Sequence, residues 1–134
     1  MKWIVAYLAA GLSFGALDAA WLSWAGKNLY RPALGDLLAP GFRPVPAIAF
    51  YLAYIAAIVW FAVRAGMDQG IGCAALNGAL LGGIAYATYD LTNQATLRHW
   101  PVHVTLIDIV WGAFATATAS AVACWAAVRF GWSE

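Results

Sequence analysis

Three aspartates lie inside long apolar stretches of the sequence, where a carboxylate is costly and is therefore a candidate for a chemical role. Asp18 lies seven residues before the end of the first stretch, Asp90 eight residues before Arg98, and Asp108 seven residues after Pro101. If these stretches cross a membrane as α-helices, which rise about 1.5 Å per residue, each aspartate would lie roughly 10–12 Å below the same membrane face. Each costs up to about 2.5–3.5 kcal/mol at the bilayer centre, so three chance occurrences are not expected. The sequence therefore predicts one layer of carboxylates.

Two kinds of chemistry suit such a layer. Three like charges in a medium of low dielectric cannot all stay ionised without help, so we expect a bound proton or cation there. Polar side chains on neighbouring faces can complete the site, namely Asn93, Tyr86, Tyr89, Tyr51 and Tyr54. Alternatively, Trp21 and Trp111, each three residues after an aspartate, can donate indole N–H groups to carboxylates that only join helices. Both interpretations remain open from the sequence.

The elements that position these residues follow from hydrophobic length. The chain has 134 residues, of which 64% are hydrophobic and 10% charged, against about 25% charged in a soluble domain. Stretches of about 20 apolar residues cross a bilayer as helices. We predict one all-α domain over 1–134, a four-transmembrane-helix bundle with spans at about 3–25, 45–64, 70–97 and 102–130. The first stretch is too long for a signal peptide, so we expect a retained span.

Tryptophan positions agree with four spans, because tryptophan gathers at membrane interfaces. One predicted interface has Trp3, Trp60, Trp125 and Trp132, and the other has Trp21, Trp24 and Trp100. The termini are therefore expected on the same side. A very short turn between Arg64 and Asp68 is expected to join the second and third helices as a hairpin.

The first loop has its own pattern. Apolar residues recur there at helical spacing, at Tyr30, Ala33, Leu34, Leu37 and Leu38. This predicts a short interfacial amphipathic helix over about 32–39, which would cover the carboxylate layer. Four basic residues would form a rim at that face, Lys27, Arg31, Arg43 and Arg98. Such a rim would attract anionic headgroups.

Small residues indicate which helix faces point inward. The first helix has Gly11 and Gly15 in line with Asp18 and Leu22, and the third has Gly78 and Gly82 in line with Tyr86 and Asp90. A GxxxG pair lets two helix backbones approach closely. A third stripe lies on the fourth helix, at Thr105, Asp108, Gly112, Ala115, Thr116 and Ala119. We expect all three stripes to face the bundle interior.

Several motifs resemble a family of bacterial membrane proteins, domain of unknown function 2177. They are GALLGGIAYATYDLTNQATLRHWPVHVTLIDIVWG at 78–112, LDAAWL at 17–22, LYRPALGDLL at 29–38 and FYLAYIAAIVWF at 50–61. The resemblance covers nearly the whole chain and implies a multi-pass protein of the bacterial inner membrane. It marks as family-like Asp18, Trp21, Tyr30, Tyr51, Tyr54, Tyr86, Tyr89, Asp90, Thr92, Asn93, Thr96, Trp100, Asp108 and Trp111. It implies no reaction.

Three functions remain compatible with the sequence. The favoured one is a pocket that binds or transports a proton, a cation or a small polar ligand. The alternatives are a membrane-embedded enzyme acting on a lipid or apolar substrate, with Asp90 or Asp108 as base, and a structural or accessory subunit. A metal site at His99 and His103 is not favoured, and no cofactor is expected. The expected partners are membrane lipids and an unknown small ligand, a homo-oligomer is left open, and a net charge of +1 argues against nucleic acid.

Overall fold

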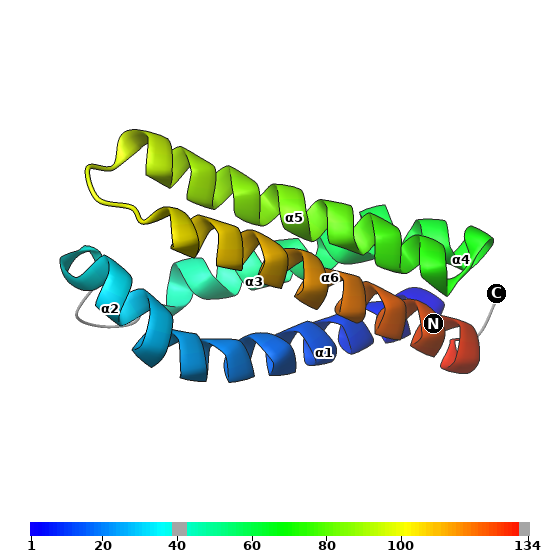
Figure 1. The fold of residues 1–134 in the computed structure, drawn as a ribbon. Coiled ribbons are helices and arrows are strands. Elements are labelled where there is room, and N and C mark those ends of the chain that lie inside the picture. Colours follow the sequence, from blue (N-terminus) through cyan, green and yellow to red (C-terminus); the bar gives the residue numbers. More distant parts are fainter. Residues whose placement is uncertain (39–42, 132–134) are drawn as a thin grey trace.

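Four long helical segments lie side by side in the computed structural model, which describes residues 1–38 and 43–131 (Figure 1). The first segment comprises α1 (Lys2–Ala25), the π-helical turn η1 (Gly26–Tyr30), α2 (Arg31–Leu34) and the 3₁₀ turn η2 (Gly35–Leu37). The second comprises α3 (Pro44–Ile58), the π-helical turn η3 (Val59–Val63) and α4 (Arg64–Gln69). The third and fourth are α5 (Ile71–Thr96) and α6 (Val102–Phe130).

The predicted four-span, all-helical fold is confirmed, because all four segments are long and apolar enough to cross a membrane. Helix ends follow local chemistry: Pro44 begins α3, where its missing N–H costs nothing.

The predicted turn between Arg64 and Asp68 is wrong, since both residues lie within α4. The chain instead turns at Gly70, whose φ of 105° disfavours any residue with a side chain. Trp132 lies outside the described residues.

The tightest contact in the bundle joins α5 to α6. A Cβ atom added at Gly82 would overlap the carbonyl oxygen of Gly112, and one at Gly78 would overlap the side chain of Ser120. The predicted close approach at this GxxxG pair is therefore present. The predicted stripe of α6 is also correct, because Thr105, Asp108, Gly112, Ala115, Thr116 and Ala119 are all buried.

The stripe predicted for the first helix is only partly right. Asp18 is buried, but Gly15 has open space beside it, and Leu22 is exposed. The buried face instead consists of Ala6, Ala10, Phe14 and Asp18, at four-residue spacing. Alanine already allows α1 to pack closely here, so the GxxxG pair at Gly11 and Gly15 is not the contact surface.

The first loop is largely a continuation of the first helix. Helical turns extend through Leu37, so residues 32–37 of the predicted 32–39 are helical, while residue 39 lies outside the described residues. The segment packs on the end of the bundle, where Ala25, Leu29 and Val104 form a small buried cluster. Its position along a membrane surface stays a prediction.

The α5–α6 contact can be tested by adding a single methyl group. We expect Gly82→Ala to destabilise the bundle by about 1–3 kcal/mol, because the new Cβ must push one backbone away from the other. Gly83→Ala is a matched control, since its Cβ would make an ordinary 3.8 Å contact with Ala113. The measurement is reversible unfolding in mixed micelles. Equal free energies for the two variants would contradict the assigned contact.

Candidate functional site

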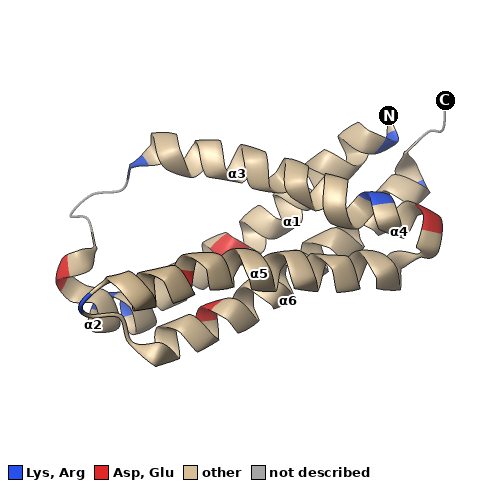
Figure 2. Cartoon of the chain, turned by 90° about the horizontal axis from the view of Figure 1, so that it is seen from above, with Lys and Arg blue, Asp and Glu red and all other residues tan. Residues whose placement is uncertain are grey.

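The three buried aspartates come from three different helices and lie in the same half of the bundle. Each of α1, α5 and α6 has one acidic residue, drawn as one red segment per helix in Figure 2. Exposed fractions are 7% for Asp18, 0% for Asp90 and 5% for Asp108. The inward-facing stripes and the common level of the three positions therefore agree with the predicted layer.

Tyr30 connects the first segment to this layer. Its hydroxyl accepts a hydrogen bond from Trp21 Nε1 at 2.9 Å and donates one to Asp108 Oδ1. Tyr30 ends η1, and the wider π-helical turn is a local bulge that is often found at functional sites. The π-helical turn η1 therefore positions Tyr30 against Asp108 of α6.

Asp90 is more deeply buried than Asp18 and Asp108, and its carboxyl oxygens lack hydrogen-bond donors in the described chain. Its carboxyl group is close to that of Asp108, yet neither of its oxygens has hydrogen-bond geometry with any donor in the described part of the chain. The Trp111 indole lies beside Asp18, but its buried Nε1 also lacks a hydrogen bond among these residues. Buried polar groups are nearly always paired. The layer therefore contains both unused acceptors and an unused donor.

A cavity of about 270 Å³ opens beside the layer. Its lining combines two of the carboxylates with aromatic and aliphatic side chains: Asp18, Trp21, Leu22, Tyr30, Leu34, Leu38, Tyr86, Tyr89, Trp100 and Asp108. None of these is Lys, Arg or His. The cavity lining is therefore acidic and otherwise mainly apolar, and it includes three tyrosines, Tyr30, Tyr86 and Tyr89.

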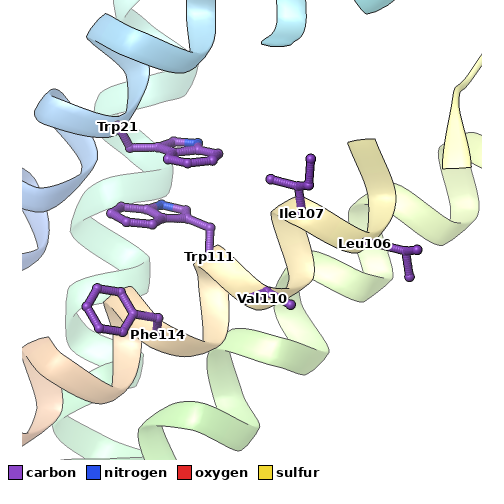
Figure 3. A pocket seen from close by; sticks show the side chains of 6 residues that line it. All are labelled: Trp21, Leu106, Ile107, Val110, Trp111 and Phe114. Atoms are coloured by element: carbon purple, nitrogen blue, oxygen red, sulfur yellow. The ribbon is translucent and has the colours of Figure 1, made fainter. Parts of the chain in front are cut away.

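On the side of α1 and α6, aromatic rings separate the cavity from the membrane-facing surface. Trp21 and Trp111 stack with ring centroids 4.7 Å apart and an angle of 10° between their planes. Figure 3 shows the two rings one above the other, with Phe114 next to Trp111. They border an outer groove of about 400 Å³ lined only by apolar and indole side chains. Trp21 is held twice, by this stack and by Tyr30.

Tyr86 depends on a glycine of the neighbouring helix. A Cβ atom at Gly112 would overlap the ring of Tyr86, so the ring lies directly on the backbone of α6. Together with Tyr89, one turn later, it lines the cavity from α5. Both tyrosines therefore lie beside the carboxylates, and their role in binding a ligand or relaying a proton stays a prediction.

Other predicted site residues lie elsewhere. Asn93 and Thr92 do not line the cavity, and the Thr92 hydroxyl donates to Tyr89 O of its own helix at 3.0 Å. Tyr54 instead shares a 2.7 Å hydrogen bond with Thr116, while Tyr51 packs against Phe14. The predicted basic rim, Lys27, Arg31, Arg43 and Arg98, is exposed at the α2 end of the bundle.

Sequence reasoning placed Tyr30 in the loop helix and left it out of the site. It also missed a polar chain beside the cavity, in which Trp100 Nε1 donates to Thr105 at 3.0 Å and Thr105 donates to Gln94 at 2.8 Å. The family-like pattern already included Tyr30 and Trp100, which was the available signal. Spacing alone could not bring residue 30 to residue 108.

The Tyr30 bridge gives a second prediction. Tyr30→Phe removes the donor to Asp108 and the acceptor of Trp21, so we expect a loss of about 1–3 kcal/mol in the free energy of unfolding. Tyr7→Phe is the control, because the Tyr7 hydroxyl makes a single, exposed hydrogen bond to Leu52 O. Thermal unfolding in detergent measures both. A Tyr30→Phe variant no less stable than the control would show that the bridge contributes nothing.

Comparison with known proteins identifies the family of the chain. Neither a search of curated proteins nor a search of solved structures gave a match. A family model described as a predicted membrane protein matches residues 3–125, which include every residue of the carboxylate layer. The four membrane-spanning helices agree with that description. The chain therefore belongs to the predicted membrane protein family DUF2177, domain of unknown function 2177.

Proposed function

We propose that this multi-pass protein binds or transports a proton or a small cation in its acidic cavity. The observation that supports this most is the charge of the site. Asp18 and Asp108 line one cavity, Asp90 lies beside Asp108, and no basic side chain is among the described residues that line the cavity. Buried charges in proteins are normally paired or bind metals. A proton or a bound cation would provide the missing positive charge.

The aromatic lining also suits a cation. Organic cations are attracted to the faces of tryptophan and tyrosine, and this attraction grows where water is excluded. Trp21, Tyr30 and Tyr86 line the cavity with the two carboxylates. An ammonium group is therefore a better match than an anion.

We place the protein in a bacterial inner membrane, where helical bundles are the usual spanning structure.

A cation titration tests the proposal. The protein in lipid nanodiscs is unfolded thermally with sodium, potassium, magnesium or butylammonium ions. We expect one of them to stabilise the wild type saturably, by about 2.7 kcal/mol at 100 times the dissociation constant. Apparent affinity should fall as the pH falls, because protons compete for the same carboxylates.

Matched variants separate binding from structural contact. Asp18→Asn and Asp108→Asn keep the shape of the side chain and remove its charge, so both should fold and lose the stabilisation. Asp68→Asn is the control, since Asp68 is exposed in α4 at the other end of the bundle. If no cation stabilises the wild type at any pH, the proposal is wrong, and variants that are then less stable than the wild type would identify the aspartates as structural contacts.

A further inference from the structure

A second cavity lies between α3 and α5, next to the acidic one. It has a volume of about 310 Å³ and is lined by Phe50, Ala85, Tyr86 and Tyr89. Tyr86 and Tyr89 also line the acidic cavity, so their rings form the partition between the two. One cavity is apolar and the other acidic. Ligand sites usually measure about 300–1,000 Å³, and these two adjoining cavities together offer one amphiphilic molecule a place for its apolar part and another for its polar part.

The apolar cavity opens toward lipid because α3 packs loosely. In Figure 2 the N-terminal half of α3 stands apart from α5 and α6. Phe50, which lines the cavity from α3, is itself 50% exposed. A hydrocarbon chain can therefore enter from the membrane without crossing a packed interface.

The wall that Tyr86 and Tyr89 form is less constrained than the wall that Trp21 and Trp111 form on the opposite side of the acidic cavity. On the α1–α6 side, Trp21 is hydrogen-bonded to Tyr30 and stacked on Trp111. Tyr89 is 62% exposed, makes an edge contact with Trp100, and its hydroxyl makes no hydrogen bond within the described residues. Turning the Tyr89 ring costs no hydrogen bond, whereas displacing Trp21 breaks one. The passage between the cavities therefore lies at the tyrosines.

Charge at the α2 end argues for the same route. Four basic residues are exposed at that end against one acidic residue, Asp36, so the net charge there is positive and would repel a cation that approaches from water; the basic residues are Lys27, Arg31, Arg43 and Arg98. A cation that is already dissolved in the membrane through a hydrocarbon tail avoids this rim. Lateral entry between α3 and α5 brings its head to the carboxylates from below the rim.

We infer that the ligand is a single-chain amphiphilic amine, with its ammonium head between Asp18 and Asp108 and its tail in the α3–α5 cavity. This inference rests on the proposed function, since the carboxylates must first bind a cation. It adds the chemical class of the ligand and its direction of entry. The free hydroxyl of Tyr89 would accept a hydrogen bond from the head as it passes.

The test compares dodecylamine with butylamine in nanodiscs, using the wild type and Ala85→Phe. The larger side chain fills the apolar cavity and leaves the carboxylates unchanged. We expect Ala85→Phe to weaken dodecylamine binding by about tenfold, the size of a modest packing contact, and butylamine binding by no more than about twofold. Membrane partitioning of each amine is the same for both proteins and cancels in this comparison. Ala53→Phe, at an exposed position of α3 that does not line the cavity, should change neither affinity.

The outcomes separate this inference from the proposed function. Equal effects of Ala85→Phe on both amines, or binding of metal ions without either amine, would overturn the amphiphile and leave the cation site standing. Failure of every cation would overturn both. Dodecanoate binding as well as dodecylamine would also overturn the inference, because the carboxylates should repel an anionic head.

A second measurement needs no variant to fold. A dodecylamine analogue with a diazirine in the middle of its tail is photolysed with the wild-type protein, and the adducts are located by mass spectrometry. We expect them on Phe50, Tyr86 or Tyr89. Adducts confined to residues 106–114 would place the tail in the groove between α1 and α6 and overturn the inference, as would adducts spread evenly over all lipid-facing residues.

Discussion

The close approach of α5 and α6 at glycine is the contact on which the rest of the site depends. Gly82 lies so close to Gly112 that a Cβ atom at Gly82 would overlap the Gly112 carbonyl oxygen, so a shift that brought a larger residue into this contact would push the helices apart. Asp90 follows Gly82 by about two turns and Asp108 precedes Gly112 by about one, so this register brings the two carboxyl groups together. The same contact leaves the space on α6 in which the Tyr86 ring lies. Larger residues at these positions would separate both the acids and the tyrosine that borders their cavity.

The consequence of that register is a concentration of carboxyl groups in an apolar bundle. Tyr30 donates to Asp108, but both oxygens of Asp90 lack a donor among the described residues. An unpaired buried polar group costs about 1–3 kcal/mol, and a charged one more. A structure that only needed to join helices could use hydroxyl pairs, as Tyr54 and Thr116 do near the middle of the same bundle. The proposed binding of a proton or cation beside Asp108 would account for this unpaired acceptor better than helix association does.

The enclosure around this charge is uneven. Toward α1 and α6, stacked indoles and the Tyr30 bridge hold the wall in place. Toward α3, the wall consists of tyrosines beside a helix that makes few contacts with α5 and α6. Parts of a protein with few buried contacts open most readily, and binding sites often use them. The site thus has one wall held by stacking and hydrogen bonds and one with few contacts, and the second is where the inferred ligand would enter.

Hydrophobic length and helical periodicity were sufficient to predict the four spans, the inward aspartates and the stripes of α5 and α6. These features are local, because they depend only on the residues of one helix and on the thickness of the membrane. The turn at Gly70, the alanine stripe of α1 and the bridge from Tyr30 to Asp108 were not predictable in this way. Each depends on how far one helix continues and which neighbour it meets. Periodicity assigns a residue to a face, but only packing between helices determines which distant side chains share a cavity, so Tyr30 joins the site while Asn93 does not line it.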